Sequence, residues 1–279
     1  MDTRFRRLLA GTTGLTFVLM LLGVYTASSA AGLTCAGRWP FCDGWLGLFP
    51  ANWMSFIEWF HRLVAMITGF VILGTTGLAW YRGKDRRTRF ALLAAVVLLP
   101  AQIILGALTV TLNGLFPGGY SPPIQAAHFL TATLVFGLLG YATARTYAPR
   151  ERSELRAAAL LAVALVPLQY LFSFGTVFVY SETVQIIYYT LSLGLFALLV
   201  GIVVWVDADQ YRRQRLLSGV AAALLTFQML LGRRLLGSPD RLLSDAVAIG
   251  LFACLLAAAH FAYRSDDLTL PVVGTLVGR

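Results

Sequence analysis

The chain has 279 residues, of which 58% are hydrophobic and only 13% are charged, and its formal net charge is +9. This composition excludes an ordinary water-soluble domain and predicts a polytopic membrane protein. Its basic residues fall between apolar runs instead of gathering on one surface, so we expect the lipid bilayer, and no nucleic acid, as its partner.

Eight apolar runs are long enough to cross a bilayer of about 30 Å, which takes roughly 20 residues. The first run follows three arginines and ends in small residues, as a signal peptide does, but its apolar part is too long for a typical h-region. We therefore expect an uncleaved first span in an all-α membrane protein with eight transmembrane helices, arranged as two tandem four-helix bundles. The runs lie at residues 8–31, 56–81, 90–112, 123–144, 156–179, 184–206, 216–232 and 242–263.

The distribution of Lys and Arg predicts the orientation. Cytoplasmic loops of membrane proteins carry the excess of these residues. Of the 22 in this chain, 17 fall at the two termini or in the loops that lie on the same side as the termini. Both termini are therefore expected in the cytoplasm of a multi-pass plasma-membrane protein. The loop that contains Cys35 and Cys42 then faces the oxidising exterior, where a cysteine pair can form a disulfide.

A short internal repeat suggests how the chain is divided. The sequence QIILG at residues 102–106 recurs as QMLLG at residues 228–232, in the third apolar run of each half. The match is short, so a duplicated bundle is about as likely as not. We expect an N-terminal half that carries the functional site, a basic cytoplasmic linker and a C-terminal half, at residues 1–143, 144–156 and 157–279.

Two of the three histidines lie at matched depth in the N-terminal half. His61 lies about one turn inside the second apolar run from the outer side, and His128 lies a similar distance inside the fourth. Two imidazoles at one level on neighbouring helices of a four-helix bundle are the usual arrangement for holding a haem iron from both faces. The alternative is that each histidine only hydrogen-bonds to a neighbouring helix, which we favour less for a pair than for a single membrane histidine.

Glu58 lies three residues before His61, so the two share a helix face. An ionised carboxylate costs about 2.5–3.5 kcal/mol at mid-bilayer and less near an interface, so Glu58 is expected to be paired, protonated or functional. Arg62 is either its ion-pair partner at the membrane surface or a contact for a haem propionate, with Glu58 then acting as a catalytic acid or base. Gln125 either orients His128, contacts the ligand or hydrogen-bonds to another helix.

The cysteine pair has two interpretations. A disulfide between Cys35 and Cys42 would close a loop of about eight residues and stabilise the fold by roughly 2–3 kcal/mol through the entropy of the unfolded chain. The alternative is an electron relay through the thiols, but the spacing is not the C-x-x-C of disulfide oxidoreductases. We favour a structural disulfide that orders a lid over the two histidines.

Four motifs occur in order over residues 23–135: GLTCAGRWPFCDG, then IEWFHR after Pro50, then LGALTVTLNG and QAAHF. Together they resemble the haem A synthase family, in particular its bacterial and archaeal members with a cysteine pair in the first outer loop. The resemblance implies eight spans in two similar halves. It also implies an oxidoreductase that converts the C8 methyl of haem O to the formyl group of haem A by successive hydroxylations, for terminal oxidases and so for respiratory-chain assembly.

Carried over by position, the resemblance makes His61 and His128 the haem iron ligands around the substrate haem O. It makes Glu58 the catalytic glutamate, and Cys35 and Cys42 the loop cysteines. The sequence shows no nucleotide-binding or phosphate-binding loop, so reducing power is expected from another protein. A haem O synthase is a further candidate partner.

The C-terminal half departs from the family, which usually has a second histidine pair there for a haem b cofactor. No histidine lies between residues 129 and 259. His260 lies about 22 Å deeper than Asp245, near the cytoplasmic surface, so it cannot be an outer-side ligand. Either this half is a scaffold, which we favour, or a second haem has unusual ligands such as Tyr188 or Met229.

Two other functions stay open. One is a b-type membrane cytochrome in which the histidine pair holds a permanent haem for electron transfer. The other, less favoured, is a membrane thiol oxidoreductase that acts through the cysteine pair. The ionisable Glu58 one turn from a ligand, together with the motif set, favours the enzyme.

Overall fold

The computed structural model describes residues 3–35, 38–112, 121–147, 149, 152–173, 176–206, 212–232 and 241–264. In this part of the chain all regular structure is helical, and eight helices are long and apolar enough to cross a membrane. The all-α, eight-span prediction is therefore confirmed. The helices are α1 (Thr3–Ser28), α2 (Trp53–Tyr81), α3 (Arg86–Thr111), α4 (Pro122–Ala144), α5 (Arg152–Leu171), α6 (Glu182–Trp205), α7 (Arg212–Gly232) and α8 (Arg241–Arg264).

Polar caps fix where several helices begin. The side chain of Asn52 accepts a hydrogen bond from the Ser55 N–H at the start of α2, and Asp85 caps α3 in the same way. Such caps satisfy backbone donors that have no partner inside the helix. They explain why α2 and α3 begin three or four residues before the apolar runs do.

The prediction for the fifth span was wrong at its end. The apolar run continues to residue 179, but α5 ends at Leu171. Beyond it the chain turns, and the ring of Phe178 stacks on that of Phe172 with centroids 4.7 Å apart. Two apolar residues after Leu171 thus stack on each other in the connection to α6, and hydropathy alone does not distinguish such a connection from a longer helix.

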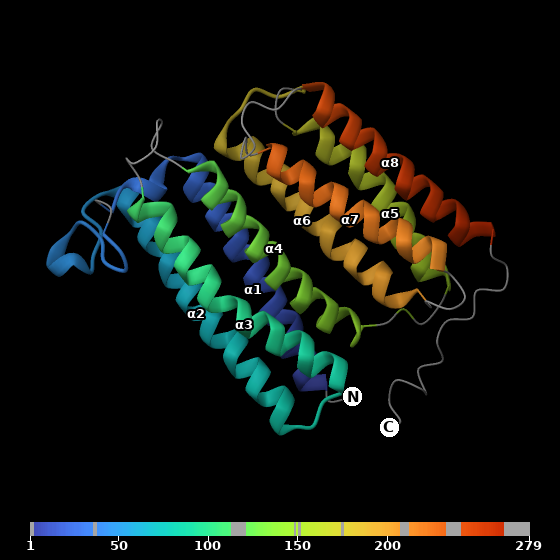
Figure 1. Ribbon diagram of the computed structural model, residues 1–279, viewed down its shortest axis with the longest axis horizontal. Coiled ribbons are helices and arrows are strands. Elements are labelled where there is room, and N and C mark those ends of the chain that lie inside the picture. The colour runs from blue at the N-terminus through green and yellow to red at the C-terminus, as the bar shows by residue number, and fades with distance from the viewer. Residues whose placement is uncertain are drawn as a thin grey trace.

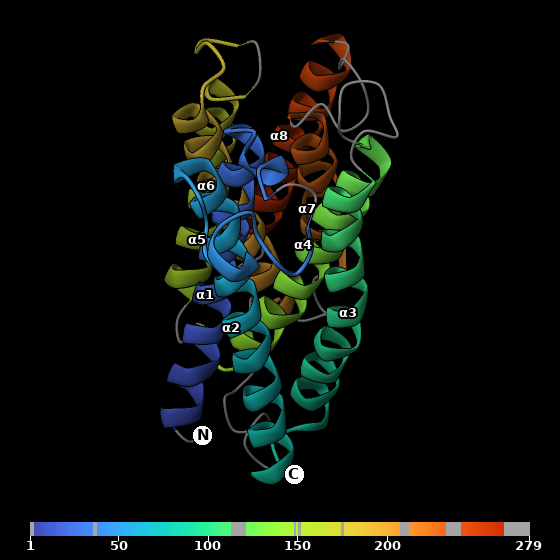
Figure 2. The same cartoon turned by 90° about the vertical axis from the view of Figure 1, so that its left-hand side faces the viewer.

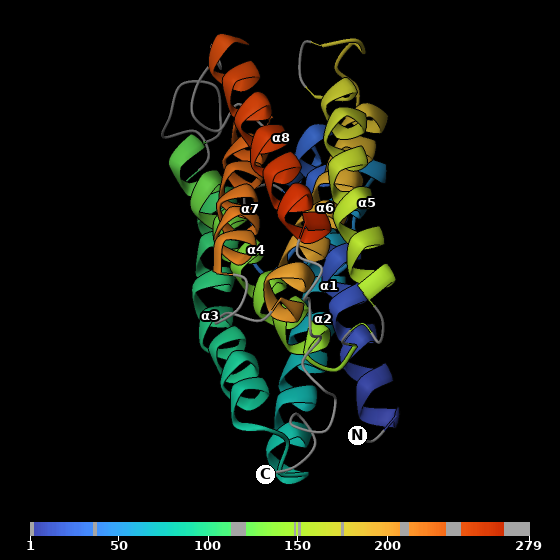
Figure 3. The same ribbon diagram turned by 90° about the vertical axis from the view of Figure 1, so that its right-hand side faces the viewer.

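The eight helices form two rings of four (Figure 1). In the first ring α1 and α3 each pack against both α2 and α4; in the second α5 and α7 each pack against both α6 and α8. Figures 2 and 3 view the assembly from the side of the first ring and from the side of the second. The two rings meet where α1 and α4 pack against α6, and the aromatic pairs Phe129–Tyr189 and Phe136–Phe196 lie in this contact.

The outer loop lies at one end of the first ring and contains two short 3-10 helices, η1 (Ala31–Leu33) and η2 (Trp45–Gly47). The start of α1 and the end of α8 lie at the opposite end of the molecule (Figure 1). Because α2 and α4 are diagonal members of their ring, both run from the loop end inward. Polar side chains near their first turns therefore lie at one level, below the loop.

Candidate functional site

His61 and His128 lie at similar depths on the diagonal helices α2 and α4. His61 is eight residues beyond the start of α2, about 12 Å along its axis, and His128 is six residues beyond the start of α4, about 9 Å. Both are partly buried. His61 thus lies about two turns inside its helix rather than one, because α2 begins earlier than its apolar run.

Each imidazole lies against a glycine on a flanking helix. A Cβ added to Gly23 of α1 would lie 3.1 Å from Nε2 of His61, and one added to Gly106 of α3 would lie 3.2 Å from Cε1 of His128. Both distances are tighter than ordinary van der Waals contact. Each glycine stands five residues before the end of its helix. The two imidazole rings therefore occupy equivalent places on their helices. Each place is open because the residue beside it is a glycine, which has no side chain.

A glutamine that was not predicted as a site residue reaches His128. Nε2 of Gln102 on α3 lies 3.4 Å from Nε2 of His128. Oε1 of Gln102 is buried and has no hydrogen-bond partner among the described residues. Gln125, for which the sequence left open orienting His128, contacting the ligand or bonding to another helix, is partly buried one turn before His128. The available signal for Gln102 was its place as the first residue of the QIILG repeat.

Glu58 is buried near the start of α2 and pairs with Arg62 one turn later. The side chains of Glu58 and Arg62 are 6% and 14% exposed, and Nε of Arg62 donates to Oε1 of Glu58 over 2.8 Å. The sequence analysis offered a surface ion pair or a propionate contact for this arginine. The pair forms, but in a buried setting where surface screening is weak.

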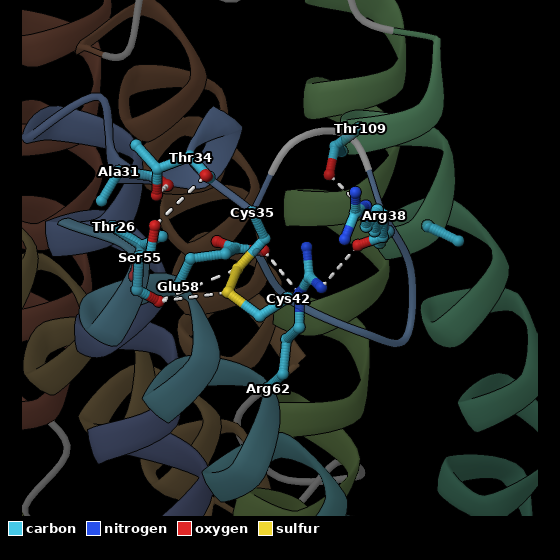
Figure 4. Close-up of polar contacts among 12 residues, drawn as sticks. Thr26, Ala31, Thr34, Cys35, Arg38, Cys42, Ser55, Glu58, Arg62 and Thr109 are labelled. Atoms are coloured by element: carbon cyan, nitrogen blue, oxygen red, sulfur yellow. Dashed lines mark hydrogen bonds and ion pairs between the residues drawn. A yellow bond between two sulfur atoms is a disulfide. The ribbon is translucent and has the colours of Figure 1, made fainter. Parts of the chain in front are cut away.

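The same guanidinium also contacts the outer loop, which sequence reasoning missed. Nη1 of Arg62 donates to the main-chain oxygens of Arg38 and Phe41, over 2.9 and 2.7 Å. Nη2 is buried without a hydrogen-bond partner among the described residues. Figure 4 shows the arginine extending from α2 toward the loop, with Glu58 and the disulfide beside it.

Cys35 and Cys42 form a disulfide, as predicted, and both residues are almost fully buried. Their sulfur atoms each lie 3.8 Å from the main-chain oxygen of Ser55 in the first turn of α2. The covalent ring of residues 35–42 therefore rests on the start of the helix that carries Glu58 and His61. A sulfur pair bonded in this way offers no thiolate to a metal ion.

A carboxylate–hydroxyl network holds the loop to α2. Oγ of Ser55 donates to Oδ2 of Asp43 over 2.6 Å, and the Ala51 N–H donates to Oδ1 of Asp43 over 3.1 Å. These two hydrogen bonds, the one from Ser55 first, hold the pKa of Asp43 below its ordinary value. Asp43 therefore keeps its charge, and its contacts with Ser55 and Ala51, to a lower pH than an ordinary aspartate does.

Two tyrosines and a polar network fill the core of the C-terminal ring. Tyr188 is 1% exposed and donates to the main-chain oxygen of Gln228 over 3.2 Å, and the neighbouring Tyr189 donates to that of Met229 over 2.5 Å. Nε2 of Gln169 donates to Oε1 of Gln228 over 3.2 Å. The candidate ligands Tyr188 and Met229 are thus both in the packed interior.

The repeated glycine has a different neighbour in the second ring. A Cβ on Gly232 of α7 would lie 3.0 Å from the ring of Tyr188, which comes from the preceding helix, α6. In the first ring, Gly106 of α3 instead meets His128 from the following helix, α4. Asp245 accepts a hydrogen bond from the Tyr170 hydroxyl, and His260 is exposed near the inner end of α8. None of the described contacts places His260 at the outer end of the molecule, where the disulfide loop lies.

Comparison with known proteins gives a match to one family over the region of this site. Residues 48–178 match the family described as cytochrome oxidase assembly protein. A protohaem IX farnesyltransferase of Halobacterium salinarum is 32% identical over 145 residues, which are 52% of this chain and 30% of that protein. Haem A synthases of Bacillus licheniformis and Alkalihalophilus pseudofirmus are 34% and 31% identical over 45% and 48% of this chain.

The chain spans less than half the length of these curated relatives: the two matches to haem A synthases cover 39% and 46% of those proteins. No solved structure matches the chain. The family match therefore covers α2 to α5, which include Glu58, His61 and His128, and it begins after Cys35 and Cys42.

Proposed function

We propose that this chain is a member of the haem A synthase family, since its residues 48–178 match the cytochrome oxidase assembly protein family, and that it oxidises the C8 methyl of haem O to the formyl group of haem A. The observation that carries this proposal is the pair of imidazoles on diagonal helices, each lying against a glycine and both at the depth of a buried carboxylate. The substrate is a flat macrocycle, and its iron accepts one imidazole on each face.

The residues fit such a substrate. Diagonal helices of a four-helix ring face each other across its centre, which is where haem sites of bundles are built. His61 and His128 would hold the haem iron. Gln102 would orient His128, because a hydrogen bond to one ring nitrogen fixes which nitrogen faces the metal. Gln125 stays a candidate contact with the substrate.

Glu58 is the candidate acid or base. It is the buried carboxyl group one turn before His61, so it lies beside the space in which the macrocycle would bind. Hydroxylation of a methyl group requires proton movement at the reacting edge, which this carboxyl group would provide. Arg62 commits Nε and Nη1 to protein acceptors, so its Nη2 is the donor left for a haem propionate.

The second ring serves as a scaffold in this proposal. Its candidate iron ligand Tyr188 is fully buried and donates its hydroxyl proton to a main-chain oxygen, and Gly232 leaves no gap beside that ring. The N-terminal half, residues 1–143, would thus provide both binding and chemistry. Residues 157–279 would support it without a haem b.

Location and partners follow from the same proposal. The eight helices suit a multi-pass protein of the plasma membrane, with both termini in the cytoplasm and the disulfide loop outside. Relatives named protohaem IX farnesyltransferase suggest a source of haem O, because haem O carries a farnesyl group. A haem O synthase and a protein that supplies reducing power are therefore the proposed partners.

The test is expression of the chain in cells that make haem O but no haem A, followed by extraction and chromatography of the haems. We expect haem A or its hydroxymethyl precursor. His61→Ala and His128→Ala should abolish the conversion, while His260→Ala, at the opposite end of the molecule, should leave it nearly intact. A folded, haem-loaded protein that yields neither product would disprove the synthase proposal.

A b-type cytochrome remains the second candidate, because the same imidazole pair would suit a permanent haem. The two functions differ at Glu58. In a synthase Glu58→Gln should strongly lower the rate of conversion while haem O stays bound, whereas in a cytochrome the bound haem should be protohaem and its reduction should be insensitive to this change. A thiol oxidoreductase is less favoured because both sulfurs are buried in a disulfide.

A further inference from the structure

Arg62 makes three charge-assisted hydrogen bonds that join two separate parts of the site. One goes to the carboxylate of Glu58, over 2.8 Å, within α2. The other two go to the main-chain oxygens of Arg38 and Phe41, over 2.9 and 2.7 Å. Both of these oxygens belong to the ring that the Cys35–Cys42 disulfide closes.

We propose that Arg62 is a positioning residue through which the disulfide-closed loop, residues 35–42, holds the carboxylate of Glu58 in place. The guanidinium group is planar and its donors point in fixed directions. With Nη1 held by two loop oxygens, the direction of Nε is also set, and Nε is the donor that Glu58 receives. The loop therefore acts on the carboxylate through the guanidinium group of Arg62.

The loop can exert this control because it is tied to the first turn of α2 at Ser55, through both the main chain and the side chain of that residue. The disulfide packs on the main-chain oxygen of Ser55, and the Ser55 hydroxyl binds Asp43 just beyond the ring. Within the loop itself, Cys42 donates its N–H to the main-chain oxygen of Gly47 over 2.7 Å. Opening the disulfide removes the covalent tie between the two ends of the ring, so the oxygens that orient Arg62 lose their fixed separation from α2.

An ordinary ion pair between residues four apart on a helix would behave differently. It would hold both side chains loosely, and a change in the loop would not reach it. Here both side chains are largely buried, and the arginine makes two hydrogen bonds to the loop and one to the carboxylate. The proposal adds a positioning residue to the proposed function. Only the test that measures turnover of haem O rests on that function.

The first experiment needs no turnover. Infrared difference spectra between the purified chain and its Glu58→Gln variant isolate the carboxyl band of Glu58. We expect this band to shift in Arg62→Gln, in Arg62→Lys and in the Cys35→Ser/Cys42→Ser double variant. Lysine keeps the positive charge but lacks the planar guanidinium group with its fixed donor directions. Reduction of the unmodified chain with a membrane-impermeant phosphine should reproduce the shift, which covers the case that the double variant does not fold.

The matched control is Arg145→Gln. Arg145 has the same 14% side-chain exposure as Arg62 and forms a comparable ion pair with Asp85, over 3.0 Å, at the opposite end of the bundle. Its loss should leave the Glu58 band unchanged. An unchanged band after reduction of the disulfide would overturn the proposal, even if Arg62→Gln shifts it, because the loop would then not act on the carboxylate.

The second experiment measures conversion of haem O. Arg62→Gln should lower turnover by about tenfold or more, counted per haem-loaded chain because Nη2 of Arg62 is also the candidate donor to a haem propionate. Glu58→Gln/Arg62→Gln should be no slower than Glu58→Gln alone, because a residue that acts through Glu58 has nothing further to lose. Additive losses would contradict a positioning role. If the unmodified chain makes no haem A, the proposed function fails, while the infrared result still decides the role of Arg62.

Discussion

Nε2 of His61 faces Gly23, and Cε1 of His128 faces Gly106, so a single methyl group at either glycine would press on an imidazole. We predict that Gly23→Ala and Gly106→Ala weaken haem binding several-fold, because overpacking of this kind costs about 1–3 kcal/mol. The measurement is the haem content per purified chain, with its absorption spectrum. Gly14→Ala, on the same helix as Gly23 and with open space around it, is the control. Equal loss in all three would show a general effect on helix packing.

At this scale the sequence predicted the residues whose chemistry is distinctive. Histidines and a glutamate inside apolar runs are costly, so they attract attention without any knowledge of packing. Gly106 and Gln102 carry no such signal, since glycine is common in membrane helices and glutamine readily bonds between helices. Their roles depend on which helix face meets His128, which is a tertiary property. The loop contacts of Arg62 were missed for the same reason.

The start of α2 and the outer loop form one unit whose stability should depend on pH. Asp43 has a lowered pKa in the folded chain, first because of the Ser55 hydrogen bond. Its contribution is therefore complete above the ordinary value of 3.8 and is lost as the pH falls through the lower, folded value. We predict that Ser55→Ala raises the Asp43 pKa toward 3.8, as measured by carboxyl carbon NMR.

The control for this titration is Ser28→Ala, which removes a hydroxyl group that donates to the Tyr25 oxygen within the end of α1. It should leave the Asp43 titration unchanged. An Asp43 pKa that is the same with and without the Ser55 hydroxyl would mean that another contact holds the loop. The helices themselves were easier to predict than this loop, because their apolar length is visible in the sequence while the ties of Asp43 are not.

At the scale of the whole molecule, the four helices of each ring pack against one another in the same order. The side chains in the interiors of the two rings differ. The number of spans and the short QIILG repeat predicted two bundles. The absence of histidines between residues 129 and 259 indicated that the two bundles have different roles. The sequence could not show what takes the place of those histidines. In the structure the space is closed by Tyr188 and Tyr189, whose hydroxyl protons go to main-chain oxygens of α7.

We therefore predict about one haem per chain. Tyr188→Phe and Met229→Leu should keep that haem, since neither side chain can reach an iron without leaving its buried position. Tyr188→Phe should lower stability by about 1 kcal/mol through the lost hydrogen bond. Haem and protein are quantified in the same sample, and His61→Ala serves as the variant that loses the haem. Two haems in the unmodified chain and one in Tyr188→Phe would instead make Tyr188 a ligand, because this substitution removes only the hydroxyl group and leaves the apolar ring in place.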